Sequence, residues 1–396
     1  MKSRKATHTG DVEIRRRFFD GHGSPIRFRL ALLLLALSGT LHAGRPPALV
    51  PDNADVVLER LPLGYAALMP TAGKAPALAQ IQALLATAAR TGDARLATRA
   101  EAMLAQLPAS VSDSPAALQA RAFAAQHRHD FAGALKLLDA LIARDPRDGG
   151  ARLSRAQILL VQGRLDRVRG DCAALSLGID ADAGLLCIAA LSLRMGDYGT
   201  AASLLDRLLA ETSMDPAIAA YASLMRGAAA SRAGDADADR WFKRALAPAP
   251  DDVRTLAAYA RHLRSHDENR RVVHLLAKAP ATDGLRLQLA MAVHALGLAQ
   301  AAVLTASQGR RYALAHEVGI QPEMRDEAEF LLTLRGNAAA ALALAQRNFE
   351  NQRDYEDVDI MRRSAIAAHR PDVLAELERW EHSQHIASAP TDEARR

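Results

Sequence analysis

Four arginines and one histidine share a position two residues before a turn, near the C-terminal end of a predicted helix. They are Arg90, His127, Arg194, Arg232 and Arg264. A row of cationic side chains could hold acidic side chains or a peptide carboxylate, because guanidinium groups pair strongly with carboxylates. The alternative is that each cation interacts with the last carbonyls of its own helix. The five residues are candidate partner-binding residues, and both interpretations stay open.

Two cysteines flank a connection centred on Gly178-Ile179-Asp180, and each is about equally far from it. This spacing predicts that Cys172 and Cys187 lie at the same height on neighbouring antiparallel helices. In an oxidising compartment, a disulfide here would close a short loop and contribute about 3 kcal/mol at most. Two small buried thiols are the alternative. Either way, the predicted role is structural.

A metal site receives little support from the spacing of the histidines. His262 and His266 stand four residues apart on one predicted helix face, but no third ligand is indicated. We therefore expect both to be solvated residues at a helix end. The acidic run Asp354–Asp359 is most simply a solvated helix start. No metal or other cofactor is predicted.

Motifs for catalysis are also missing from the pattern. The sequence has no phosphate-cradling glycine loop, no nucleophile elbow and no suggestive carboxylate pair. A non-enzymatic protein is predicted. Two alternatives stay open: a carrier of a small ligand or metal, and an enzyme whose site lies in the irregular C-terminal part. For the enzyme, the candidate residues are Arg310, Arg311, His316 and Glu323.

The composition of the 396 residues favours helices. Hydrophobic residues make up 49% and charged residues 24%, whereas aromatic residues make up only 4%. Alanine and leucine supply much of the apolar content, and both are strong helix formers. The net charge is +5, but residues 1–43 hold eight basic and three acidic residues, which leaves 42 of each downstream. Because the chain after residue 43 is formally neutral and has few aromatic side chains, nucleic-acid binding is not expected.

The first 43 residues read as an export signal. Arg27 and Arg29 precede the apolar run Leu30–Leu37, which is too short to span a bilayer comfortably, and small residues follow it. Cleavage is predicted after Ala43, so the mature protein would have no stable membrane anchor. The run Arg15-Arg16-Arg17-Phe18-Phe19 leaves a twin-arginine route open beside ordinary secretion. The periplasm is the expected location, and residues 44–75, rich in proline, are an expected N-terminal cap.

The rest of the chain repeats with a period near 34 residues. Turns fall at Gly92, His129, Gly163, Gly196, Gly234, His266, Gly297 and Gly336, and a ninth is expected near His369-Arg370-Pro371. An Asp or Asn usually follows the turn residue and can cap a second helix. Five residues after the turn, a small residue recurs, and proline recurs near the end of the second helix. The small residues are Ala97, Ala134, Ala201 and Ala341.

These features resemble the tetratricopeptide repeat family, and the chain looks like a secreted bacterial protein of that type. The best-matching stretch is Pro115–Asp148, with Asp130-Phe131, Ala134 and Asp145-Pro146. Arg164 and Leu298 depart from the pattern at the capping position, and the signature tryptophan is missing. The resemblance implies an all-α, right-handed solenoid of about eight to nine helix-turn-helix repeats. Regular repeats are expected over 76–298, irregular ones over 299–386, and a disordered tail over 387–396.

The resemblance also implies a function. Stacked helix pairs form a concave groove lined by first helices, and such arrays bind a peptide or partner protein there. The expected function is therefore a non-enzymatic protein-interaction scaffold of the bacterial cell envelope, with a partner that the arginine row would make acidic. The oligomeric state is left open.

Overall fold

The computed structural model describes residues 78–211 and 214–387, and this part of the chain is an all-α solenoid of nine helix pairs. The first five pairs are α1 (Leu78–Thr91) with α2 (Ala94–Leu104), α4 (Pro115–His127) with α5 (Phe131–Arg144), α6 (Gly149–Val161) with α7 (Leu165–Ala174), α8 (Ala181–Met195) with α9 (Tyr198–Leu209), and α10 (Pro216–Ala233) with α11 (Ala238–Leu246). The last four are α12 (Val253–Ser265) with α13 (Asn269–Leu276), α14 (Asp283–Ala295) with α15 (Ala301–Glu317), α16 (Met324–Thr333) with α17 (Ala338–Phe349), and α18 (Tyr355–Ala367) with α19 (Pro371–Ser383). A short helix, α3 (Ala109–Ser112), precedes α4, and a π-helical turn, Leu175–Ile179, follows α7.

The turn inside each pair needs one residue in the left-handed backbone region, which explains the recurring glycine. Gly92, Gly196 and Gly336 have φ values of 68°, 81° and 61°. His129 and His369 take the same conformation, at 61° and 53°. In the α12–α13 pair, the residue with positive φ is Asp267 and not His266. The predicted turn there was therefore one residue too early, and Arg264 lies one position out of register with the other arginines.

In the described part of the chain, the predicted side-chain cap is present on four of the nine second helices, α2, α5, α9 and α17. Asp93, Asp130 and Asp197 each accept a hydrogen bond from a backbone N–H in the first turn of the helix that follows. Arg164 makes no such bond, in line with the departure seen in the sequence. The recurring alanines are almost fully buried between helices; they are Ala97, Ala134, Ala201 and Ala341. Small side chains there let the two helices of a pair approach closely.

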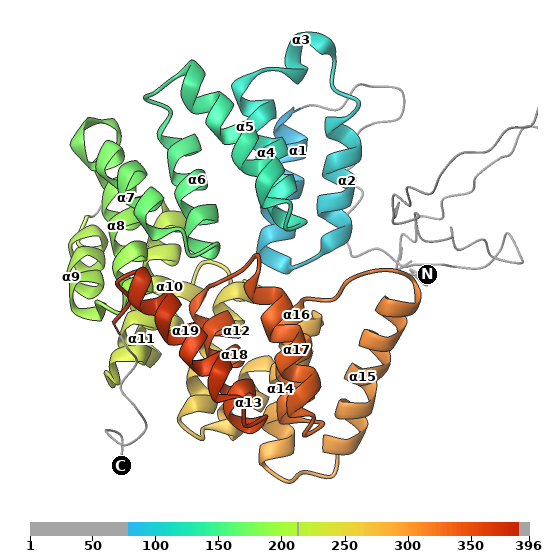
Figure 1. Cartoon of the computed structure of the whole chain (residues 1–396). Coiled ribbons are helices and arrows are strands. Elements are labelled where there is room, and N and C mark those ends of the chain that lie inside the picture. The colour runs from blue at the N-terminus through green and yellow to red at the C-terminus, as the bar shows by residue number, and fades with distance from the viewer. Residues whose placement is uncertain (1–77, 212–213, 388–396) are drawn as a thin grey trace, which may run out of the picture. The chain divides into compact units, whose positions relative to one another are not determined.

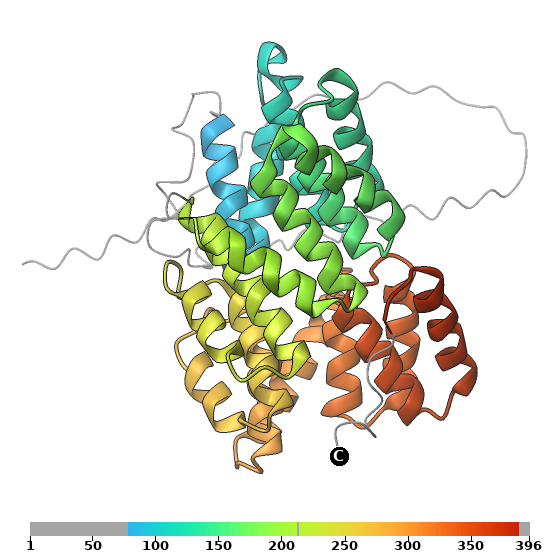
Figure 2. The ribbon, with the colours of Figure 1, turned by 90° about the vertical axis from the view of Figure 1, so that its left-hand side faces the viewer.

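The row of pairs curves, so that helices far apart in the chain come together. First helices pack on the first helices of neighbouring pairs, and α12 packs against α1. Figures 1 and 2 show the last pairs, in red, lying beside the ends of the first helices of the earlier pairs. α15 meets α16 through Tyr312 and Phe330, whose ring centroids are 5.4 Å apart, and through His316 and Glu327.

Two further findings bear on the sequence-based expectations. Among residues 78–211 and 214–387, no helix is long and apolar enough to cross a membrane. The proposed signal segment, its cleavage position after Ala43 and the Pro-rich lead-in lie outside the described residues, as does the tail from residue 388.

Candidate protein-binding groove

The arginine row is occupied by acidic residues of the chain itself. Arg90 pairs with Asp251, just before α12. Arg232 on α10 lies 3.2 Å from a carboxylate oxygen of Glu356, and its guanidinium carbon is 3.9 Å from the centre of the Tyr355 ring. Arg264 donates to Gln288 at 3.0 Å and lies 3.8 Å from Glu329. Two of these three arginines therefore reach acidic residues of α16 and α18.

Arg194 is the most deeply enclosed member of the row. Only 7% of it is exposed, and Trp380 of α19 covers its guanidinium group at 5.5 Å. Its Nε lies 4.0 Å from Asp354, and neither Nε nor Nη2 has a hydrogen-bond partner. Burial lowers the pKa of Arg194, although the charge of Asp354 opposes this. An incompletely paired guanidinium thus sits where α8 meets the last pair.

His127 differs from the four arginines because no ion pair holds it. Burial lowers the pKa of its imidazole, and the neighbouring His129 lowers it further. His129, the turn residue, instead reaches the C-terminal part: its Nε2 is 3.5 Å from Glu323, and its Nδ1 is 3.3 Å from the amide of Gln352.

The acidic run was wrongly predicted to be a solvated helix start. Asp357 is only 1% exposed, and it accepts hydrogen bonds from Asn348 at 2.9 Å and from the backbone N–H of Asp354 at 2.8 Å. Burial by itself would raise the pKa of Glu356, but the charges of Arg261, Arg232 and Arg325 outweigh burial and hold that pKa at about 2. For Asp357, burial prevails over Arg325 and raises the pKa to about 6. The run is a packed helix start that faces cations.

Backbone contacts reinforce this return of the C-terminal pairs. The N–H of Arg353 donates to the carbonyl of Val161 at 2.6 Å, and the N–H of Ala387 donates to Met195 at 2.9 Å. Gly163 has a φ of +65°, and a Cβ there would lie 2.7 Å from the ring of Trp380. The ends of α6 and α8 are therefore joined to residues more than 190 positions later in the chain.

Residues along α6, along most of α8 and in the first turns of α10 line an apolar groove. Its volume is about 390 Å³, and its lining includes Leu153, Leu160, Leu186, Ala190, Ile218 and Tyr221. Ile218 is 41% exposed, and Leu153, Leu160 and Tyr221 are half-buried. Asp180 and the exposed Asp182 lie at the start of α8 and also line the groove. A partner segment with apolar side chains and a cation would match this surface.

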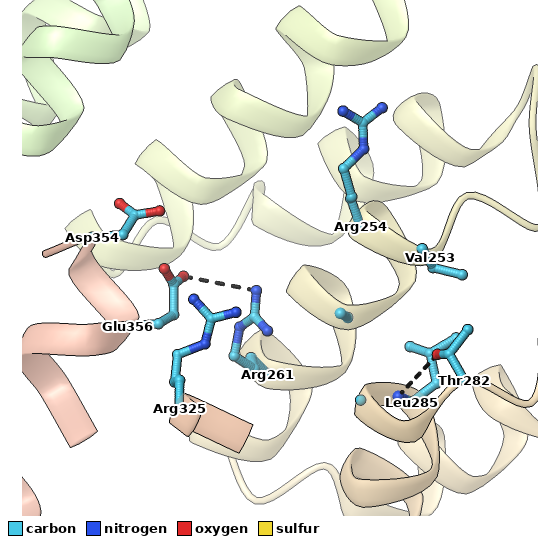
Figure 3. A pocket seen from close by; sticks show the side chains of 10 residues that line it. Val253, Arg254, Arg261, Thr282, Leu285, Arg325, Asp354 and Glu356 are labelled. Atoms are coloured by element: carbon cyan, nitrogen blue, oxygen red, sulfur yellow. Dashed lines mark hydrogen bonds and ion pairs between the residues drawn. The ribbon is translucent and has the colours of Figure 1, made fainter. Parts of the chain in front are cut away.

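A second cavity, of about 300 Å³, lies where α12, α14, α16 and α18 begin. Arg254, Arg261 and Arg325 line it together with Asp354 and Glu356. In Figure 3, Arg261 and Arg325 direct their guanidinium groups toward Glu356, whereas the Arg254 side chain points away from these three residues. These arginines were not predicted as site residues, although Arg254 and Arg261 are seven residues apart and so share one helix face.

His262 and His266 were both predicted to be solvated, and only one of them is. His262 is only 8% exposed; its Nδ1 lies 2.8 Å from the hydroxyl of Ser231, and its ring packs 5.5 Å from Phe242. The expectation of two solvated histidines is therefore wrong for His262, whereas His266 is exposed. Within the part of the chain that the structure describes, no group of three His, Cys, Asp or Glu residues could hold a metal.

The cysteines and the candidate catalytic residues can also be placed. Cys172 and Cys187 are joined in a disulfide between α7 and α8, and both are buried.

The candidate catalytic residues do not form one cluster. Arg311 pairs with Asp283, the Nε2 of His316 lies 2.8 Å from Glu327, and Glu323 faces His129.

No protein-family model matches the chain, and no curated protein matches it in sequence. Among solved structures, a tetratricopeptide repeat protein from Parabacteroides merdae is 16% identical, with a TM-score of 0.38, over 62% of this chain and 97% of its own. The Cut9–Hcn1 hetero-tetramer of the APC/C has 12% identity and a TM-score of 0.34, over 72% of this chain and 62% of the other. The tetratricopeptide repeat domain of P58(IPK) has 16% identity and a TM-score of 0.20, over 74% and 99%.

These likenesses are too low to assign a family or a function. The chain is a helix-pair solenoid. That description follows from its own stacked pairs, its left-handed turn residues and its buried alanines.

Proposed function

We propose that the protein is a non-enzymatic scaffold that binds a segment of a partner protein in the open groove on α6, α8 and α10. The observation that carries this proposal is the apolar lining of that groove, in which Ile218 is 41% exposed and Leu153 and Leu160 are half-buried. Because the groove runs across three first helices, an extended or helical segment could contact several pairs at once.

The chemistry of the groove indicates a partner that is apolar and carries a basic side chain. Asp182 is exposed at one end of the apolar lining, and the Asp180 carboxylate lies beside it while capping α8. A lysine or arginine there would be attracted to both carboxylates, while the apolar side chains would gain about 25 cal/mol for each Å² buried.

An acidic partner remains a second candidate, through Arg90, His127, Arg194, Arg232 and Arg264. The supporting observation is that Arg232 already holds the acidic start of α18. Such a partner would have to displace carboxylates of this chain. A labelled peptide of the sequence Asp354–Asp359 should therefore bind an Asp354→Ala/Glu356→Ala variant at least tenfold more tightly than the wild type. Fluorescence anisotropy that shows binding to neither protein would remove this candidate.

The place of action that we propose is the bacterial cell envelope. The basic, apolar and small-residue segments before Ala43 support export, and the disulfide between Cys172 and Cys187 is suited to an oxidising compartment. N-terminal sequencing of protein recovered from the periplasm should begin after Ala43, and full-length protein in the cytosol would oppose this.

Site-specific photo-crosslinking tests the groove. A crosslinking residue at Ile218 should give a discrete adduct in cells, whereas one at Arg207, exposed on the outer helix α9, should not. Ala190→Arg places a long side chain in the groove and should abolish the adduct. The crosslinked partner peptide should be apolar with a basic residue. Equal adducts from both positions, or an adduct that survives Ala190→Arg, would contradict the proposal.

A further inference from the structure

Three arginines line the cavity between the starts of α12, α14, α16 and α18, and their guanidinium groups contact carboxylates only at long distances. Two carboxylates line it as well. The ion pairs of the arginines are all long: Arg254 to Asp252 at 3.6 Å, Arg261 to Glu356 at 3.8 Å, and Arg325 to Asp357 at 3.4 Å and to Asp326 at 3.8 Å. Well-formed charged hydrogen bonds are 2.7–2.9 Å long. Most guanidinium N–H groups here are therefore available to a further acceptor.

Arg155 is an arginine of the same chain whose guanidinium group is closely paired with carboxylates. Arg155 lies 2.5 Å from Asp171 and 2.7 Å from Asp139. Both of its pairs are at ordinary hydrogen-bond length, and Asp171 is 1% exposed. The arginines at the cavity are thus less closely paired than Arg155, and Arg194 and Arg264 share this property.

Helix starts add to the positive potential. Val253 and Arg254 are in the first turn of α12, Gly284 and Leu285 in that of α14, and Arg325 in that of α16. The N-terminus of a helix carries a partial positive charge and unpaired N–H groups. α12 and α14 have side-chain caps from Asp252 and Thr282, but Glu323 gives α16 none. The first N–H groups of α16 therefore lack a side-chain cap.

We propose that this cavity binds a small organic anion with two anionic groups, carboxylate or phosphate. One group would take the donors of Arg261 and Arg325, in competition with Glu356, and the other would take Arg254. Val253, Ala257 and Leu285 provide an apolar wall for the carbon chain between them. A volume of about 300 Å³ suits a small metabolite. A peptide does not fit this part of the groove, because α16 and α18 fill it.

This site is separate from the partner groove on α6, α8 and α10, so either proposal can fail without the other. A ligand here would contact α12 and α14 as well as α16 and α18. It would therefore hold the last two pairs against the middle of the solenoid, and binding should slow hydrogen exchange in α18.

Isothermal titration calorimetry of the mature chain tests the site with four probes: succinate, citrate, inorganic pyrophosphate and acetate. The multivalent probes should bind with dissociation constants of about 1 mM or lower, and acetate at least tenfold more weakly. Preference for citrate and succinate would indicate a carboxylate ligand, and preference for pyrophosphate a phosphate ligand. Binding should weaken as salt rises.

Variants locate the binding. Arg254→Ala and Arg261→Ala should each weaken the best probe at least tenfold. Arg286→Ala, a change of an exposed arginine on α14 that does not line the cavity, should leave binding unchanged. Because Arg254 does not pair with α18, its loss should leave α18 exchange in the free protein unaltered. No measurable heat with any multivalent probe, or equal binding by Arg254→Ala, Arg261→Ala and wild type, would overturn the proposal.

Discussion

The two parts of the concave surface differ in what meets the first helices. Leu153 and Leu160 of α6 and Ile218 near the start of α10 line an open apolar groove. At the C-terminal ends of α8 and α10, Arg194 and Arg232 are covered by Trp380, Tyr355 and Glu356 of the last pair. The apolar part is exposed and the cationic part is covered, which is the reverse of a surface arranged for solubility alone. This contrast suggests that partner binding and internal closure are assigned to different stretches of the same helices.

The largest expected effect on stability comes from reversing the charge of Arg232, which the last helix pair covers. Arg232→Glu would leave Glu356 without its nearest cation and place two carboxylates together. Breaking a fully buried ion pair costs about 3–5 kcal/mol, and for this half-buried pair we expect the lower end of that range. We expect α18 and α19 to lose hydrogen-exchange protection while α6 keeps it. Arg207→Glu, on the exposed face of α9, should change stability by about 0.5 kcal/mol or less. Unchanged protection of α18 in Arg232→Glu would mean that the covered part does not depend on the arginine.

Removing the disulfide tests the open part. Cys172→Ser/Cys187→Ser frees a loop with a sequence separation of 15 and should lower stability by up to about 3 kcal/mol. The loss should be confined to α7 and α8, where the bond lies. Hydrogen exchange that rises equally in α18 would show that the open and the covered parts of the concave surface unfold as one unit. That result would contradict the distinction between them.

A smaller effect is expected from a matched pair of glycine substitutions. Gly163→Ala and Gly297→Ala both place a side chain at positive φ, which costs roughly 1–2 kcal/mol. At Gly163 the new Cβ would also meet Trp380 at 2.7 Å, whereas nothing lies within 4 Å at Gly297. Urea denaturation should therefore show a larger loss for Gly163→Ala. Equal losses would argue that Trp380 does not rest on the end of α6 in solution.

The smallest effects are expected from pH, and they have opposite signs at two adjacent residues. Glu356 has a pKa of about 2 against its ordinary 4.5, so its contribution to stability is present above pH 4.5 and is lost as the pH falls toward 2. Asp357 has a pKa of about 6 against its ordinary 3.8, so its contribution is present below pH 3.8 and is lost as the pH rises through 6.

Two variants separate these contributions in denaturation experiments across pH. The stability deficit of Glu356→Gln should shrink as the pH falls below 4.5. Asp357→Asn should gain stability relative to wild type between pH 3.8 and about 6, because the wild type alone loses a buried proton there. Parallel pH profiles for wild type and both variants would show that neither carboxylate is held in the covered part.

Local features of the fold could be read from the sequence because they depend on neighbouring residues. The turn at Gly196, the cap at Asp197 and the buried Ala201 all belong to one helix pair, and the 34-residue spacing repeats them. The equal distance of Cys172 and Cys187 from their connection placed them side by side for the same reason.

The covered part of the groove could not be predicted in this way. Whether Glu356 reaches Arg232 depends on the small rotations between successive helix pairs, added up over several repeats. The spacing of residues in the sequence does not determine this total rotation. The burial of His262 had a similar origin, since Phe242 and Ser231 come from the preceding pair. The repeat spacing also did not indicate that Asp267, and not His266, takes the left-handed conformation.

A double-mutant cycle between Arg232 and Glu356 tests most directly whether the chain's own acidic helix occupies the arginine row. Arg232→Ala, Glu356→Ala and the double variant would be compared by native-state hydrogen exchange of the α18 amides. We predict a coupling free energy of about 1 kcal/mol or more, because the two side chains are paired at 3.2 Å within a covered site. Additive effects within about 0.3 kcal/mol would show that the two residues do not interact in solution and would contradict the account.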